Sequence, residues 1–307
     1  MNLLDMNNIS SSFGIKTIEF KTLSERAILI ITSGEDKFIL KEKGTLEQIK
    51  REIKLLKHLQ YHFIHTQTPI MNDSGEYTVC YKNKNYCIYN YLEGLTFHAE
   101  ESLLNPSVPK LLGETIAHLN QAMKTIRFSN EFPNNDIFLS VYSFAVDEIV
   151  KVDASEHLIT IYQQLKEDIK AVLSTLPKQV IHRDAHIHNI VIKDDTLVGL
   201  IDFDLAEVNV NIFDICYCST SILSEVFSNE TQRLNWLSFV GDLIANYNQH
   251  NSLSMIEKRG IWYVMLCIQS VFMAYFSKNK DIFKSNKEMF LWIYENKSNL
   301  ERKYLIS

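Results

Sequence analysis

The chain has 307 residues, of which 46% are hydrophobic and 22% are charged, and it carries a formal net charge of −6 at pH 7. This length and composition predict a soluble globular protein with room for two regions of ordinary domain size. The excess of negative charge argues against nucleic acid as the main partner, since binding to phosphates needs a basic surface.

No targeting or membrane signal is expected from the sequence. Residues 1–13 contain neither a basic segment nor a long apolar run, so no signal peptide is expected. The longest apolar run, 262–276, is too short to cross a bilayer and predicts a buried helix, so no membrane partner is expected. Five cysteines without a disulfide-like spacing favour the reducing cytoplasm.

The N-terminal part of the chain alternates short apolar runs with turns. The runs at 13–20, 27–32 and 37–41 predict three strands, and residues 77–92 predict two more. A helix is predicted between these two groups. Its start is marked by a capping-box pattern at Thr45.

The predicted helix has one charged residue at the edge of its apolar face. Glu52 lies three residues after Ile49 and four residues before Leu56, both apolar positions of the buried stripe. This spacing places the Glu52 side chain beside the core instead of on the solvent side.

Beyond residue 94 the periodicity is mainly helical. Helices are predicted at 111–124 and 158–173, and the chain is helical again from Asp214 to its end. Residues 98–176 hold eleven Asp or Glu and six Lys or Arg, which accounts for most of the excess negative charge. These carboxylates either cover solvated helix faces or line a binding site.

A β-hairpin is predicted near the middle of the chain. Two apolar runs, 190–192 and 197–201, flank a polar turn at 193–195. Asp184 and Asn189 precede the hairpin. Because a hairpin brings its ends together, these side chains are expected to converge with that of Asp202, which follows it. Three oxygen ligands without a cysteine favour Mg²⁺ over zinc.

The motifs around this hairpin resemble those of protein-kinase-like enzymes. The string HRD at 182–184, Asn189 five residues after the Asp, and IDFD at 201–204 resemble the catalytic and metal-binding loops. The IDFD ending, followed closely by Asp214, resembles the small-molecule branch, which includes aminoglycoside phosphotransferases, choline kinases, homoserine kinase and methylthioribose kinase.

The resemblance implies an α+β, bilobal protein-kinase-like fold. An N-lobe of antiparallel sheet with one helix would span residues 1–93, and a mostly helical C-lobe would span 94–307. The implied activity is transfer of the γ-phosphate of ATP or GTP to a hydroxyl of a small molecule. Asp184 would accept or orient the hydroxyl proton, and Asn189 and Asp202 would hold the Mg²⁺ that bridges phosphate oxygens.

The resemblance also assigns the nucleotide-binding residues. Lys41 would pair the α- and β-phosphates and would itself pair with Glu52. Backbone groups near Asn90 and Leu92 would bond the adenine edge. The glycine-rich loop of the family would fall at 21–26, where this chain has no glycine, so Ser24 and backbone amides would hold a phosphate.

The structural residues of the catalytic loop are also implied. Asp214 would bond the backbone of the loop, and His182 would be structural. Zinc hydrolysis is an alternative reading of the histidines around Asp184, but their spacing fits no hydrolase motif and leaves Asn189 unexplained. Arg183 stands where the small-molecule branch usually has glycine and matches protein kinases instead.

Two alternatives concern the substrate and the activity. Residues 203–213 contain no Ser, Thr or Tyr and meet Asp214 without a peptide-docking element, which argues against a protein substrate. The missing glycines allow a catalytically weak, nucleotide-binding protein. If the acidic residues of 98–176 line the cleft, the acceptor is an amine-bearing alcohol or aminosugar, with homoserine or a neutral sugar as the alternative.

Overall fold

The computed structural model describes residues 2–305. Contacts between residues divide the chain into two compact units. Unit 1 consists of Met1–Leu95 and Val191–Asp204, and unit 2 consists of Thr96–Ile190 and Leu205–Ser307. The sequence-based division put the whole of 94–307 in one region, whereas the contacts group the segment 191–204 with unit 1.

Unit 1 contains two α-helices in its described part and most of the strands of the protein. Its elements are α1 (Leu3–Ser10), the 3₁₀ helix η1 (Ser11–Phe13), β1 (Thr17–Thr22), β2 (Ala27–Thr32), β3 (Lys37–Lys43), α2 (Leu46–Tyr61), β4 (Val79–Tyr81), β5 (Lys84–Asn90) and β9 (Thr196–Leu200). Three elements cross the boundary between the units: β6 (Leu95–Thr96), β8 (Ile190–Lys193) and η5 (Phe203–Leu205).

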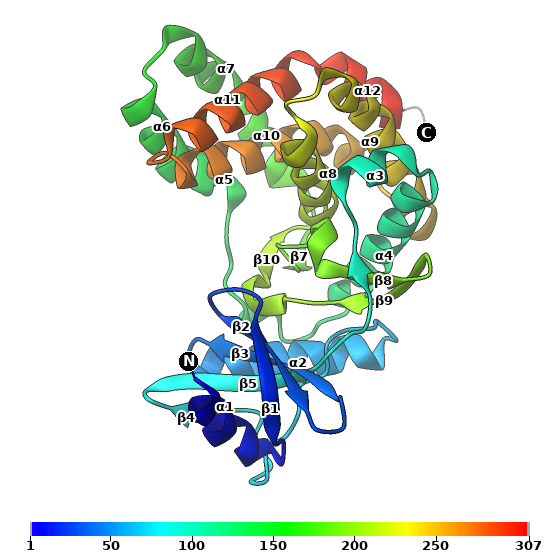
Figure 1. The fold of residues 1–307 in the computed structure, drawn as a ribbon. Helices are drawn as coiled ribbons and strands as arrows, with labels where there is room; N and C mark the ends of the chain where they lie inside the picture. Colours follow the sequence, from blue (N-terminus) through cyan, green and yellow to red (C-terminus); the bar gives the residue numbers. More distant parts are fainter. Residues whose placement is uncertain (1, 306–307) are drawn as a thin grey trace. The chain divides into compact units, whose positions relative to one another are not determined.

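The five strands β1 to β5 form one antiparallel sheet in the order β1-β2-β3-β5-β4. Side chains alternate between its faces. Leu40 of β3 packs with Met6 and Ile9 of α1 in one apolar cluster, and Lys43 of the same strand reaches α2 on the other face. The two helices therefore cover opposite faces of the sheet (Figure 1).

Helix α2 confirms the predicted start, but α1 was not expected. The Thr45 hydroxyl accepts the Gln48 N–H, and the Gln48 side chain accepts the Thr45 N–H, which completes the capping box. Helix α1 has a similar box between Asn2 and Asp5. The apolar residues at the start of the chain cover too few turns to predict a helix from periodicity. Helix α1 is stabilised by its packing on the sheet.

The central hairpin is confirmed. β8 and β9 are neighbouring strands, and Asp194 and Asp195 between them have φ of +50° and +57°. Two consecutive left-handed residues are typical of a type I′ turn, whose twist matches that of the strands. The turn therefore sets the register that brings Asp202 to the end of the hairpin.

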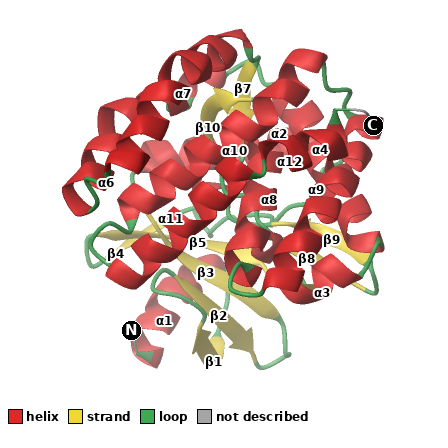
Figure 2. Ribbon diagram, turned by 90° about the horizontal axis from the view of Figure 1, so that it is seen from above, coloured by secondary structure: helices red, strands yellow, loops and turns green. Residues whose placement is uncertain are grey.

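Unit 2 is mostly helical (Figure 2). Its elements are α3 (Ala99–Leu104), α4 (Ser107–Lys124), η2 (Ser129–Glu131), α5 (Ile137–Ser140), the π-helix η3 (Val141–Ala145), α6 (Val146–Val152), α7 (Glu156–Thr175), β7 (Lys178–Ile181), η4 (Ile187–Asn189), β10 (Glu207–Val210), α8 (Phe213–Val226), α9 (Glu230–His250), α10 (Met255–Tyr275), α11 (Lys280–Glu295) and α12 (Lys297–Tyr304).

The short stretch before Asp214 contains a strand that the sequence analysis did not predict. β10 pairs with β7 in antiparallel register, with Glu207 opposite Ile181 and Val210 opposite Lys178. The pairing holds the chain that follows IDFD as a strand.

The antiparallel sheet of unit 1 and the helices of unit 2 confirm the predicted α+β class. Within residues 2–305, no helix is long and apolar enough to span a membrane.

Candidate active site

Two lysines of β3 lie on the face of the sheet that α2 covers. Lys43 Nζ lies 2.7 Å from Glu52 Oε2 and also pairs with Asp204. Lys41 Nζ lies 3.1 Å from Asp202 Oδ1. Glu52 thus pairs with Lys43, and the expected Lys41–Glu52 pair is wrong by two residues. Such an error keeps the correct face, because side chains repeat every second residue along a strand.

The Lys43 ion pairs are deeply buried. The side chains of Lys43 and Glu52 are 3% and 8% exposed. Burial lowers the pKa of the Lys43 ammonium, but the charges of Glu52 and Asp204 outweigh it and raise the pKa overall. Burial likewise opposes ionisation of Asp204, but Lys43 lowers its pKa overall. The Tyr89 hydroxyl donates to Glu52 Oε1 at 3.1 Å. Burial raises the pKa of Glu52 overall, although the charge of Lys43 opposes the shift.

Lys43, Tyr89 and Asp204 were not among the predicted site residues. The alternation along β3 was a usable signal for Lys43, because it puts Lys43 on the face of Lys41. Asp204 lay in the IDFD string without an assigned role. Nothing in the local sequence singles out Tyr89 from the other tyrosines.

Ser24 lies away from these lysines. It lines a cavity of about 400 Å³ together with Leu40, Glu42 and Tyr86. Leu40 and Glu42 alternate with Lys41 and Lys43, so this cavity is on the opposite face of the sheet. The Ser24 hydroxyl accepts the N–H groups of residues 26 and 27 and closes the turn between β1 and β2. Ser24 therefore lies on the opposite face of the sheet from the lysines beside which it was expected to bind a phosphate.

Asn90 ends β5, where the adenine edge was expected to bind. Its N–H donates to the Thr68 carbonyl at 3.0 Å, and its side-chain oxygen accepts the Thr68 N–H. An adenine contact at Asn90 would therefore use its carbonyl oxygen. The Leu92 side chain lies over Gly199 of β9, where a Cβ atom would come within 2.9 Å of Leu92 Cδ1. The adenine contacts of Asn90 and Leu92 remain predictions.

In unit 2, a buried carboxylate holds the backbone of the HRD segment that follows β7. Asp214 Oδ2 accepts the His182 N–H at 3.0 Å, and Oδ1 accepts the Arg183 N–H at 2.8 Å. His182 is fully buried, and its Nδ1 accepts the Asp184 N–H at 3.3 Å. These bonds confirm that Asp214 and His182 shape the backbone of the loop.

Arg183 has a left-handed backbone, with φ of +71°. This conformation costs a non-glycine residue roughly 1–2 kcal/mol, which explains why glycine suits this position in the small-molecule branch. The Arg183 side chain pairs with Glu207 Oε2 at 3.2 Å. Glu207 belongs to β10, so the same strand pairing that holds the loop also provides the partner of Arg183.

Asp184 is surrounded by hydrogen-bond donors. Asn189 Nδ2 donates to Asp184 Oδ2 at 2.9 Å, and the Tyr217 hydroxyl donates to Oδ1 at 3.0 Å. His186 Nε2 lies 3.6 Å from Oδ1. Burial opposes ionisation of Asp184, but the bonds to His186 and Tyr217 and the histidine charges lower its pKa overall. Asp184 therefore remains an ionised hydrogen-bond acceptor, and Asn189 Oδ1 stays available to a metal.

A cavity of about 390 Å³ in unit 2, cavity A, opens beside Asp184. Its charged lining residues are Arg183, Asp184 and Glu207, and much of the remaining wall is aromatic. The aromatic residues of the wall are Phe213, Tyr217, Phe272, Tyr275 and Phe276. Carboxylates beside aromatic faces are favourable surroundings for an organic cation.

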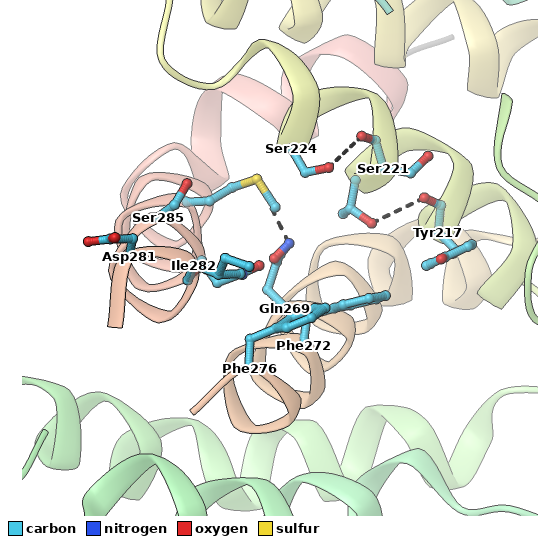
Figure 3. Close-up of a pocket in the computed structure, with 12 residues that line it drawn as sticks. Tyr217, Ser221, Ser224, Gln269, Phe272, Phe276, Asp281, Ile282 and Ser285 are labelled. Carbon is cyan, nitrogen blue, oxygen red and sulfur yellow. Dashed lines mark hydrogen bonds between the residues drawn. The ribbon is translucent and has the colours of Figure 1, made fainter. Parts of the chain in front are cut away.

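A second cavity of unit 2, cavity B, has a volume of about 490 Å³ and shares Tyr217, Phe272 and Phe276 with cavity A. Figure 3 shows hydroxyl groups of α8 on one side and Gln269 on the other. Ser221 and Ser224 donate their protons to backbone carbonyls of their own helix, which leaves their oxygens as acceptors. Within residues 2–305, Gln269 Oε1 is buried without a hydrogen-bond partner. Cavity B therefore presents mainly acceptors to a ligand.

The acidic residues of 98–176 do not line either cavity. Asp136 pairs with Lys178, and Asp153 pairs with Lys287. The carboxylates that do line the cavities come from other segments, namely Asp184, Glu207 and Asp281. The charge argument from 98–176 is therefore corrected, and any preference for a cation depends on these three residues instead.

Residues 18–240 match the family model described as the phosphotransferase enzyme family. Among curated proteins, the chain is 25% identical over 209 residues to a homoserine kinase of Beijerinckia indica subsp. indica. This match covers 67% of the chain and 61% of that protein, so the chain spans about three fifths of its curated relative.

The solved structures that resemble this chain include kinases of small molecules. A microcompartment-associated aminopropanol kinase has a TM-score of 0.72 at 11% identity and covers 98% of this chain and 100% of its own. An amicoumacin kinase in complex with AMP-PNP, Ca²⁺ and Ami has a TM-score of 0.66 at 15% identity and covers 93% and 88%. These likenesses confirm the kinase-like fold that the motifs predicted.

Proposed function

We propose that this chain, which belongs to the phosphotransferase enzyme family, is a phosphotransferase with an alcohol group as acceptor. It transfers the γ-phosphate of ATP or GTP to a hydroxyl of an amine-bearing small molecule, as the kinase neighbours support. The observation that carries the proposal is the position of Asp184. Its carboxylate lines cavity A and is held by Asn189 and Tyr217. In this role Asp184 accepts or orients the proton of the acceptor hydroxyl.

The proposed metal ligands are Asn189 and Asp202. Asn189 uses its Nδ2 group toward Asp184, which leaves Oδ1 for a cation. Asp202 binds Lys41 through Oδ1, and its side chain is 42% exposed. Amide and carboxylate oxygens fit Mg²⁺. When bound there, the ion would offset the negative charge that develops during phosphoryl transfer.

The two lysines receive different roles in this proposal. Lys43 is enclosed by Glu52 and Asp204, so it holds α2 and the end of the IDFD string in place. Lys41 has the more exposed partner, Asp202. We therefore assign phosphate binding to Lys41, with Glu52 supporting it through Lys43.

A cytoplasmic location is also proposed, on the basis of the five free cysteines.

The proposed acceptor is an amino alcohol or an aminosugar. Cavity A combines the carboxylate of Asp184 with an aromatic wall, which suits an ammonium group. Glu207 also lines this cavity but is paired with Arg183. In cavity B, Asp281 and the unpartnered Gln269 oxygen favour a ligand that donates hydrogen bonds. The aminopropanol kinase neighbour supports this class, and the homoserine kinase relative favours homoserine as the second candidate.

A panel assay of nucleotide turnover tests the proposal. ADP or GDP release is measured with Mg²⁺ and with amino alcohols, aminosugars, homoserine and neutral sugars as acceptors. The expected result is stimulation by amine-bearing alcohols, with Asp184→Asn as the inactive control. Stimulation only by neutral or anionic acceptors would reject the acceptor class. Turnover that persists in Asp184→Asn would reject the role of Asp184.

A further inference from the structure

A cluster of potential metal ligands lies away from Asp184, where helices α4 and α9 meet. Glu114 and His118 are four residues apart on α4 and therefore share one face of that helix. His250 is the last residue of α9. One ligand atom from each of the three side chains lies within 4.8 Å of the other two.

The backbone around this cluster is held rigidly. A Cβ atom added at Gly113 would lie 2.6 Å from the Leu243 carbonyl oxygen, so α4 and α9 approach closely beside Glu114. The Gln121 side chain donates to the backbone carbonyl of His250, and Asn120 Nδ2 donates to the hydroxyl of Tyr247 on α9 at 3.1 Å. The ligand-bearing segments are thus positioned by contacts that do not use the ligand atoms.

The three side chains are also accessible and unengaged. His118 is exposed, and Glu114 and His250 are half-buried. The two imidazole rings meet edge to face with centroids 5.0 Å apart. Within residues 2–305, the side chains of Glu114, His118 and His250 take part in no ion pair or hydrogen bond. A carboxylate and two imidazoles therefore converge without forming hydrogen bonds or ion pairs with one another.

We infer that Glu114, His118 and His250 form a Zn²⁺ site that links α4 to the end of α9. Two imidazoles with one carboxylate are a common zinc donor set, with ligand atoms about 2.0–2.2 Å from the ion and water in the fourth position. Imidazole nitrogens disfavour Mg²⁺, which prefers oxygen ligands. Small rotations of the side chains bring the ligand atoms together. The site stabilises unit 2 and is independent of phosphoryl transfer.

Calorimetric titration of the EDTA-treated protein with Zn²⁺, in excess Mg²⁺, tests this site. The wild type should bind one Zn²⁺ equivalent here. His118→Ala and His250→Ala should each weaken binding at least about tenfold, because loss of a direct ligand costs at least as much as loss of an outer partner. Zn²⁺ should also raise the unfolding temperature of the wild type and not that of His118→Ala. Co²⁺ should give the visible absorption of a four-coordinate ion.

Two control variants separate this site from other histidines. His157→Ala removes an exposed histidine of α7, and His188→Ala removes a histidine near Asp184. Both should keep the Zn²⁺ affinity of the wild type. Unchanged affinity in His118→Ala and His250→Ala would overturn the inference, as would loss of binding in His188→Ala instead. If His250→Ala fails to fold, the exposed His118 still gives a decisive result.

Discussion

The two units hold their charged residues in different ways. In unit 1, Lys43 is buried between two carboxylates, and both charges of its pair with Glu52 are almost fully removed from water. In unit 2, the Asp184 carboxylate is held by the neutral donors Asn189 and Tyr217 and opens into a cavity. The first arrangement fixes positions, because Lys43 is enclosed by its two carboxylate partners. The second leaves a negative charge facing a potential substrate.

The largest expected effect concerns the buried pair of unit 1. Lys43→Met should lower the free energy of unfolding by about 3–5 kcal/mol, because it leaves the Glu52 charge buried without its partner. Urea unfolding followed by circular dichroism measures this change.

Lys41→Met is the matched control on the same strand. Its partner Asp202 is 42% exposed, so the loss of stability should be below about 1 kcal/mol, while the nucleotide KM should rise. Equal destabilisation by the two substitutions would contradict the distinction between a positioning lysine and a phosphate-binding lysine.

The next effect concerns the open carboxylate of unit 2. Asp184→Asn should reduce phosphoryl transfer by at least about 10²-fold, the usual weight of a general base. Mg-nucleotide binding should remain near that of the wild type, since Lys41 and Asp202 are unchanged. Initial-rate kinetics and a nucleotide titration measure the two quantities. Near-normal turnover in a folded variant would remove Asp184 from the proposed mechanism.

The pH dependence of stability tests the buried carboxylate of unit 2. Burial raises the pKa of Asp214 to about 7, although the N–H groups of His182 and Arg183 oppose the shift. The folded state therefore binds more protons than the unfolded state between about pH 4 and pH 7, so stability contributed by protonated Asp214 falls as the pH rises through this range.

Asp214→Asn removes this titration. From pH 5 to pH 8, the wild type should lose on the order of 2 kcal/mol of stability relative to the variant. Urea unfolding of both proteins at the two pH values gives the difference. Parallel pH profiles would mean that the hydrogen bonds from the loop outweigh burial and that Asp214 is ionised throughout.

The smallest effect concerns a neutral donor to Asp184. Tyr217→Phe removes one hydrogen bond and should lower kcat/KM by a factor of about 5, the equivalent of about 1 kcal/mol. The pKa of Asp184 should move upward, because a donor that favours its charged form is lost. Carboxyl NMR titration and kinetics follow the two changes. A pKa that moves downward would show that Tyr217 does not stabilise the carboxylate.

Local sequence determined the secondary structure around the predicted site. The capping box at Thr45 and the hairpin with its turn at Asp194 and Asp195 need only neighbouring residues, so their patterns were sufficient. Asp184 and Asn189 were expected to converge, and Asn189 Nδ2 donates to Asp184 Oδ2 at 2.9 Å. The motif resemblance added the kinase-like fold, because these elements recur together in that family.

Tertiary structure decided which long-range partners meet. Lys41 and Lys43 share a face of β3, and only the packing of α2 on that face selects Lys43 as the partner of Glu52. Tyr217 reaches Asp184 because α8 packs beside the catalytic loop, a contact between residues 33 positions apart. The meeting of His250 with Glu114 and His118 depends in the same way on the close approach of α4 and α9 at Gly113. Periodicity along one element defines a face, but contact between two elements depends on packing that neither element encodes alone.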